Sequence, residues 1–171
     1  MGISNTLQAF KDTANRFWAA LLALLTHFFG PNWPAFLFLL VLNIVDFYYG
    51  RKKGKETDTL SSKIGAAGIA KKVSYWVTIG LAFGVSYILV EIVGPALGVN
   101  LGFLMLIGWF TLAVYILNEL TSIVENMLVL GYDVPAILVK GLAAARSAVD
   151  AAGNKIVPEP DEAEGKAGKD E

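Results

Sequence analysis

The residues best placed to do chemistry form a stripe of polar side chains along the last strongly apolar part of the chain. Positions three, four and seven apart share one side of a helix, and this side carries two carboxylates, Glu119 and Glu125. A carboxylate at membrane depth costs about 2.5 to 3.5 kcal/mol, so the stripe must face protein, water or the membrane interface. We favour contacts with other helices or with a water-lined pore; the alternative is that both carboxylates simply lie at the cytoplasmic interface. The polar stripe comprises Thr111, Tyr115, Asn118, Glu119, Ser122, Glu125 and Asn126.

Few other residues could act as catalysts or ligands. The sequence has one histidine, His27, and no cysteine, which excludes disulfides, thiolate metal sites and sites that need several histidines. One histidine and scattered serines cannot supply a nucleophile with its base and orienting group, so we expect neither an enzyme nor a cofactor. His27 is expected to be hydrogen-bonded or interfacial. Asp46 and Glu91 are expected in structural roles near opposite ends of their spans, which argues against a proton relay at matched depth.

The distribution of charge sets the elements that position these residues. Of the 171 residues, 55% are hydrophobic and 17% are charged, whereas soluble domains carry about a quarter charged residues. Asp, Glu, Lys and Arg are absent from 17–45, 73–90 and 92–118, which are runs of 29, 18 and 27 residues. About 20 apolar residues cross a bilayer core about 30 Å thick, so each run is long enough to span. The sequence predicts an all-α integral membrane protein.

The N-terminal region, residues 1–32, is expected to be an amphipathic helix followed by a break. Pro31 and Pro34 lack backbone donors and disfavour helix at the residues before them. Residues 3–29 place apolar side chains on one face and polar ones on the other, as an interfacial helix would, or a spanning helix with a narrow polar side. We favour the interfacial interpretation, because only 13 uncharged residues precede the break. The sequence therefore leaves three or four spans open, and with them the side of the N-terminus.

Residues 33–130 are predicted to form the membrane core, with spans at about 33–49, 73–93 and 101–126. Between the first two spans lies a predicted loop, 50–72, with seven Lys or Arg against two acidic residues. Such an excess of cations marks cytoplasmic loops. The cations nearest the first span are also expected to contact anionic lipid headgroups: Arg51, Lys52, Lys53 and Lys55.

Glycines have two expected roles in the second span. Gly80 and Gly84 form a small-xxx-small pair that would let helices approach closely. Gly94 and Pro95 are expected to end the span, because neither residue favours the continuation of a helix.

The C-terminal part is predicted to be a short helix and a tail. Gly131 and Pro135 predict a turn before a helix that reaches about residue 152, so that 131–152 forms one cytoplasmic unit. Residues 153–171 are polar and acidic, and such a tail cannot bury enough apolar surface to fold. With the basic loop and three spans as predicted, the C-terminus lies in the cytoplasm.

Two stretches resemble the phage-lysis and toxin-secretion holin family. Asp46-Phe-Tyr-Tyr-Gly50, followed by LSSKIGAAGIAKK at 60–72, is similar to the segment after the first span in that family. Asn118-Glu-Leu-Thr-Ser-Ile-Val-Glu-Asn126, with Gly131-Tyr-Asp-Val-Pro135 behind it, resembles the second hallmark of the family. The matching positions are Asp46, Gly50, Ser62, Gly65, Gly68, Lys71, Lys72, Asn118, Glu119, Ser122, Glu125, Asn126, Gly131 and Pro135.

This resemblance implies a phage-encoded protein that accumulates in the bacterial cytoplasmic membrane and then assembles into lesions. The lesions would release a cell-wall-degrading endolysin, or a toxin as in some clostridial relatives. The implied partners are membrane lipids, further copies of the chain and, functionally, the endolysin, with no nucleic acid. The long N-terminal extension and the acidic tail depart from the family's pattern, so N-terminal topology and timing do not transfer. Two other classes stay open: a small ion channel or transporter component whose carboxylates bind a cation, and an antiholin that regulates a separate holin.

Overall fold

The computed structural model describes residues 3–156, and all elements in this range are helical. The long helices are α1 (Ile3–Phe29), α2 (Pro34–Glu56), α3 (Ser62–Tyr87), α5 (Met105–Val129) and α6 (Ala136–Ile156). Shorter elements join them: 3-10 turns at Gly30–Asn32 and Gly102–Leu104, a π-helical segment at Ile88–Val93 and the single-turn α4 (Gly94–Leu97). The chain thus has the all-α architecture that the sequence predicts.

Three helical stretches are long and apolar enough to cross a membrane. They are Gly30–Glu56, Ser62–Leu97 and Gly102–Val129, which correspond to the three predicted spans. Helix α1 is formed as predicted but is not among the candidate spans found in the described part of the chain. It ends at Gly30, whose φ of +66° turns the chain ahead of Pro31.

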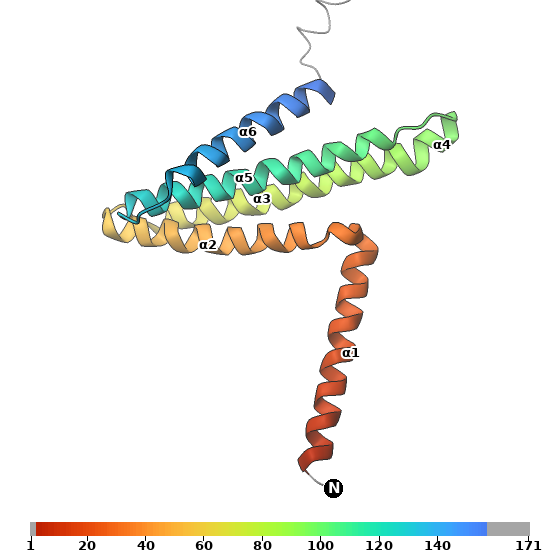
Figure 1. Ribbon diagram of the computed structural model, residues 1–171, viewed down its shortest axis with the longest axis horizontal. Helices are drawn as coiled ribbons and strands as arrows, with labels where there is room; N and C mark the ends of the chain where they lie inside the picture. Colours follow the sequence, from red (N-terminus) through yellow and green to blue (C-terminus); the bar gives the residue numbers. More distant parts are fainter. Residues whose placement is uncertain (1–2, 157–171) are drawn as a thin grey trace, which may run out of the picture. The chain divides into compact units, whose positions relative to one another are not determined.

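Two parts of the chain form separate units, divided after Phe38. The first holds α1 and the start of α2, and the second runs from Leu39 onward. In the second unit, α3 and α5 run side by side, and α6 begins beside the end of α5 and diverges from it (Figure 1). The core of this unit is small: Leu39 of α2, Ile79 of α3 and Leu112 of α5 are buried.

Large apolar side chains cover the outside of the three spans. Ile44, Leu81 and Ile92 are 63%, 64% and 57% exposed. A soluble domain would bury side chains of this size, whereas lipid tails are themselves apolar and solvate them at no cost. The exposed apolar surface therefore fits the membrane environment that the charge-free runs predict.

The predicted basic loop, 50–72, is wrong in its extent. Helix α2 continues to Glu56 and α3 begins at Ser62, so only 57–61 connects them without helix. The Ser61 side chain caps α3 by accepting a hydrogen bond of 3.1 Å from the backbone N–H of Ile64. The cations of this region are thus carried on two helix ends, which fixes their directions in a way that a loop would not.

The predicted ends of the second span and of the C-terminal helix also need correction. Gly94 and Pro95 do not end the second span, because the helix passes through Ile88–Val93 into α4 and stops at Gly98, with φ of +68°. Pro95 lies directly after the π-helical segment, so the residue without a backbone N–H stands where the helical hydrogen-bond pattern changes. Helix α6 extends to Ile156, so the first residues of the predicted tail are helical, and residues 157–171 lie outside the described range.

Candidate functional site: a polar junction beside a cavity

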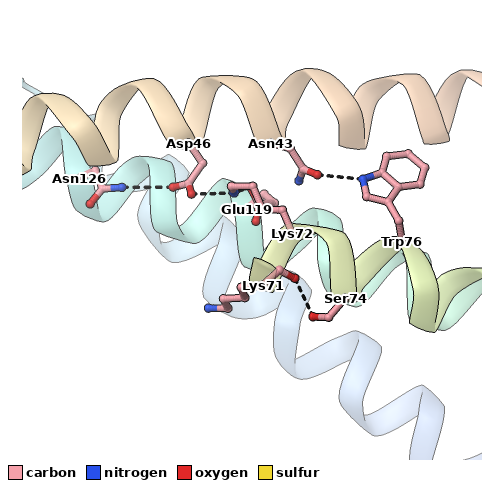
Figure 2. Close-up of polar contacts among 8 residues, drawn as sticks. All are labelled: Asn43, Asp46, Lys71, Lys72, Ser74, Trp76, Glu119 and Asn126. Carbon is pink, nitrogen blue, oxygen red and sulfur yellow. Dashed lines mark hydrogen bonds and ion pairs between the residues drawn. The ribbon is translucent and has the colours of Figure 1, made fainter. Parts of the chain in front are cut away.

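The charged residues that bound the three apolar runs on their predicted cytoplasmic side meet at one place in the structure. Lys72 Nζ lies 2.8 Å from Asp46 Oδ2 and also forms an ion pair with Glu119. Asn126 Nδ2 donates a hydrogen bond of 3.1 Å to the other oxygen of Asp46. Figure 2 shows this set, with Asp46 between Asn126 and Lys72. We call Asp46, Lys72, Glu119 and Asn126 the polar junction; it links α2, α3 and α5.

The polar junction is largely sequestered from solvent. The side chains of Lys72, Asp46 and Glu119 are 15%, 16% and 4% exposed. Each of the three lies ten residues from the end of its helix, or about 15 Å at 1.5 Å per residue. Charges at this depth are tolerated when they are paired and hydrogen-bonded. One ammonium faces two carboxylates, so Lys72 is the group on which the junction depends.

The polar stripe divides between two sets of neighbours. Glu119 and Asn126 belong to the junction, and the ring of Tyr115 stacks on Tyr75 of α3 with centroids 4.1 Å apart. Asn118 instead accepts a hydrogen bond from Arg146 of α6. The Thr111 hydroxyl donates to the Ile107 carbonyl of its own helix. Within a single chain, Tyr115, Asn118, Glu119 and Asn126 thus contact other helices, while the role of the stripe between copies or in a pore stays a prediction.

Ser122 and Glu125, the remaining stripe residues, line a polar cavity of about 440 Å³. Glu125 is exposed, whereas Ser122 is half-buried. The cavity lies between α3, α5 and α6, and its wall combines acidic, basic and amide side chains from these helices. It is lined by Asp46, Gly68, Lys71, Lys72, Tyr75, Asn118, Glu119, Thr121, Ser122, Glu125 and Arg146.

Most positions of the resemblance gather around this region. Gly50, Gly65 and Gly68 line a second cavity of about 250 Å³ beside Asp46, Lys72 and Asn126. A Cβ added at Gly50 would lie 3.8 Å from the amide nitrogen of Asn126, so α2 and α5 approach closely there. Ser62 is the exposed first residue of α3, away from the junction itself. Gly131, with φ of +75°, and Pro135 form the turn between α5 and α6, as predicted.

The cations expected at lipid headgroups are not equivalent. Lys52 Nζ donates a hydrogen bond of 2.6 Å to the hydroxyl of Tyr132, so this lysine has a partner within the chain. Arg51 lies over the ring of Phe47, 5.6 Å from its centroid, and its side chain is exposed. Lys55 is exposed and Lys53 is half-buried. The headgroup role stays a prediction for Arg51, Lys53 and Lys55, while Lys52 has a partner that the sequence did not reveal.

Sequence reasoning missed two packing contacts. The Trp76 indole donates a hydrogen bond of 3.0 Å to the side-chain carbonyl of Asn43 (Figure 2). Gly108 faces the Phe83 ring so closely that an added Cβ would lie 2.6 Å from it. By contrast, a Cβ at Gly80 or Gly84 would meet nothing within 4 Å. The tightest of these contacts between long helices is therefore at Gly108, and the predicted pair stays on the surface of the chain.

Glu91 does not join the site. Glu91 is exposed within the π-helical segment, toward the opposite end of α3 from Lys72. The side chain of His27 lies outside the described part of the structure. Among the described residues, no group of three His, Cys, Asp or Glu side chains could hold a metal ion.

Comparison with known proteins identifies the family to which the chain belongs. Residues 23–146 match the model of the bacteriophage holin family. An uncharacterized protein of Halalkalibacterium halodurans is 31% identical over 118 residues, which cover 68% of this chain and 82% of the relative. No solved structure matches the chain. Because the family match covers well over half of the sequence and takes in the polar junction, the stripe and the turn after α5, the chain belongs to the bacteriophage holin family.

Proposed function

We propose that the protein is a phage holin that accumulates in the host cytoplasmic membrane and then assembles into lesions that release an endolysin. The observation that carries the proposal is the family match over a chain with three membrane-spanning stretches, one of which bears a polar stripe. The basic ends of α2 and α3 favour an orientation in which this end, and with it the C-terminus, faces the cytoplasm. The mechanism involves no catalysis.

The distribution of polar groups supports storage followed by assembly. A monomer with its charges paired inside and apolar side chains outside is soluble in lipid and laterally free. If copies associate, polar side chains that are satisfied within one chain can exchange partners with a second chain or with water. The polar side of α1 and the polar stripe supply such surfaces, and Gly80 and Gly84 offer close approach between copies. The partners are therefore lipids, further copies and, functionally, the endolysin.

Inducible expression in a bacterium with and without a co-expressed endolysin tests the function. A holin should collapse the membrane potential abruptly at a set time, as recorded with a potential-sensitive dye, and lysis should follow only when the endolysin is present. Ser122→Leu with Glu125→Leu should change that time, because these substitutions remove the polar groups that line the cavity. An exposed pair on another helix, Ser62→Leu with Lys63→Leu, is the matched control.

Other outcomes identify the competing classes. Ion or solute flux without loss of viability would indicate a channel or transporter component. A delay in lysis caused by a separate holin would indicate an antiholin. Either result would contradict the proposal.

A further inference from the structure

Part of the polar stripe is covered by α6. Arg146 of α6 donates a hydrogen bond to Asn118 and, together with Asn118, Ser122 and Glu125, lines the polar cavity. Two polar groups that a lesion would turn toward water, Asn118 and Ser122, are thus bonded or partly covered within one chain, whereas Glu125 is exposed. Assembly through this side of α5 requires α6 to move first.

The attachment of α6 is weak along its length. None of its described side chains is buried, and Ile137 is 80% exposed. The Arg146 side chain is 46% exposed and also lies 3.5 Å from Asp150, one turn further along α6. Exposed polar contacts of this kind contribute little to stability. The cavity of about 440 Å³ occupies space that packed side chains would fill in a tight helix pair.

The turn that precedes α6 is held by backbone hydrogen bonds, from Gly131 N–H to the Leu128 carbonyl and from Tyr132 N–H to the Met127 carbonyl, as well as by side chains. The hydroxyl of Tyr132 accepts a hydrogen bond of 2.6 Å from Lys52, and its ring meets that of Tyr49 edge-on with centroids 6.0 Å apart. Gly131 adopts the left-handed conformation that the turn requires. A turn that is held in place and a helix that is loosely held would let α6 rotate away from α5 about the turn, as a strap does about a fixed point.

We propose that α6 is a strap that keeps the monomer in its storage state, an inference that rests on the proposed holin function. While Arg146 holds Asn118, α6 covers the side of α5 that carries Asn118 and the half-buried Ser122. When α6 swings out about the turn at 130–135, these side chains become available to water and to a second copy of the chain. Loss of the strap therefore advances assembly, and fixing the strap prevents it.

The first experiment measures how far α6 shields position 122 from water, and it does not depend on the formation of lesions. Because the natural chain has no cysteine, Ser122→Cys introduces a single thiol beneath the strap. Its rate of reaction with a water-soluble maleimide is measured in the full chain in vesicles, with Arg146 intact and with Arg146→Ala. We expect labelling to be several-fold faster with Arg146→Ala. Ser62→Cys, at the exposed start of α3, should label equally in both backgrounds. Equal rates at Ser122→Cys would overturn the strap, whatever the protein does to membranes.

The second experiment locks the strap. Asn118→Cys and Arg146→Cys are bridged with a reducible bifunctional thiol reagent, in vesicles of phosphatidylethanolamine and phosphatidylglycerol that hold a dye. The bridged protein should release dye at least 10-fold more slowly than the same protein after reduction, which lacks the hydrogen bond and is free to open. The matched control, Arg146→Cys with Asp150→Cys, places the bridge within α6 and should leak whether bridged or reduced.

The outcomes separate the two proposals. Equal release from the bridged and reduced Asn118–Arg146 pair would overturn the strap and leave the holin function standing. No release from any form, the unaltered chain included, would overturn the holin function, while the labelling experiment still decides whether α6 covers the stripe.

Discussion

At the scale of residues, the molecule depends on a lysine shared by two carboxylates. Lys72 contacts both Asp46 and Glu119, and the three side chains come from different helices. A buried charge without a partner is far more costly than a buried pair. The junction is therefore a source of specificity: it fixes the relative register of α2, α3 and α5 at one depth in the membrane.

Lys72→Met should destabilise the protein by about 3 kcal/mol, because it leaves two buried carboxylates without their cation. Unfolding in detergent micelles, followed by circular dichroism, measures the change. Lys71→Met, which removes an exposed neighbouring lysine, should stay within about 0.5 kcal/mol of the parent. Adding Asp46→Asn and Glu119→Gln to Lys72→Met should restore most of the loss. Equal losses of stability in Lys72→Met and Lys71→Met would contradict the role of Lys72 as the cation of the polar junction.

Gly108→Ala should destabilise the monomer by about 1 to 3 kcal/mol, because the new Cβ would lie 2.6 Å from the ring of Phe83. Gly80→Ala meets nothing within 4 Å and should not lower the free energy of unfolding of the monomer. The same unfolding measurement tests both. If Gly80 instead packs copies together, Gly80→Leu should slow dye release while monomer stability is unchanged. Equal losses of monomer stability in the Gly108→Ala and Gly80→Ala variants would show that the Phe83 contact does not matter.

At the scale of elements, α1 differs from the other long helices. It forms as predicted, yet it is not among the candidate spans and belongs to a separate unit. Apolar residues such as Phe17 and Trp18, 62% and 58% exposed, contact each other edge-on. An exposed aromatic face opposite a polar face is what an interfacial helix presents to the headgroup region.

Single cysteines on the two faces of α1 distinguish the interfacial from the spanning arrangement. Asn15→Cys should react with a water-soluble maleimide several-fold faster than Phe17→Cys in vesicles, because only the apolar face of an interfacial helix is in lipid. Both positions carry exposed side chains in the structure. Slow labelling at both sites would instead indicate that α1 crosses the membrane and would raise the number of spans to four.

At the scale of the whole molecule, gaps in charge were enough to predict the fold. The three charge-free runs correspond to the three candidate spans, because length and hydrophobicity decide whether a helix can cross a bilayer. The partners of the polar residues could not be predicted in the same way. A helical wheel gives the side on which Glu119 lies but does not identify the helix that faces it. One signal was present: Asp46, Lys72 and Glu119 each bound an apolar run on the side predicted to face the cytoplasm, which places them at a similar depth. Nothing local revealed the contacts of Asn43, Tyr132 or Arg146, which depend on pairing between distant segments.

Orientation is also a property of the whole molecule. Replacing Arg51, Lys53 and Lys55 with Gln should place a measurable fraction of molecules with the α2–α3 connection outside, because cations near span ends set the orientation. Labelling of Ser62→Cys in intact cells with an impermeant maleimide measures that fraction. Lys155, Lys166 and Lys169, far from any span, serve as the control set for the same substitution. Full protection of Ser62→Cys in both sets would contradict the role of the basic helix ends.

The short connection 57–61 has a consequence for biosynthesis. At about 3.5 Å per residue it can reach at most about 18 Å, well short of the bilayer core of about 30 Å. The adjoining ends of α2 and α3 therefore emerge on the same side of the bilayer when both helices span it. An error in orientation would then invert the two helices together.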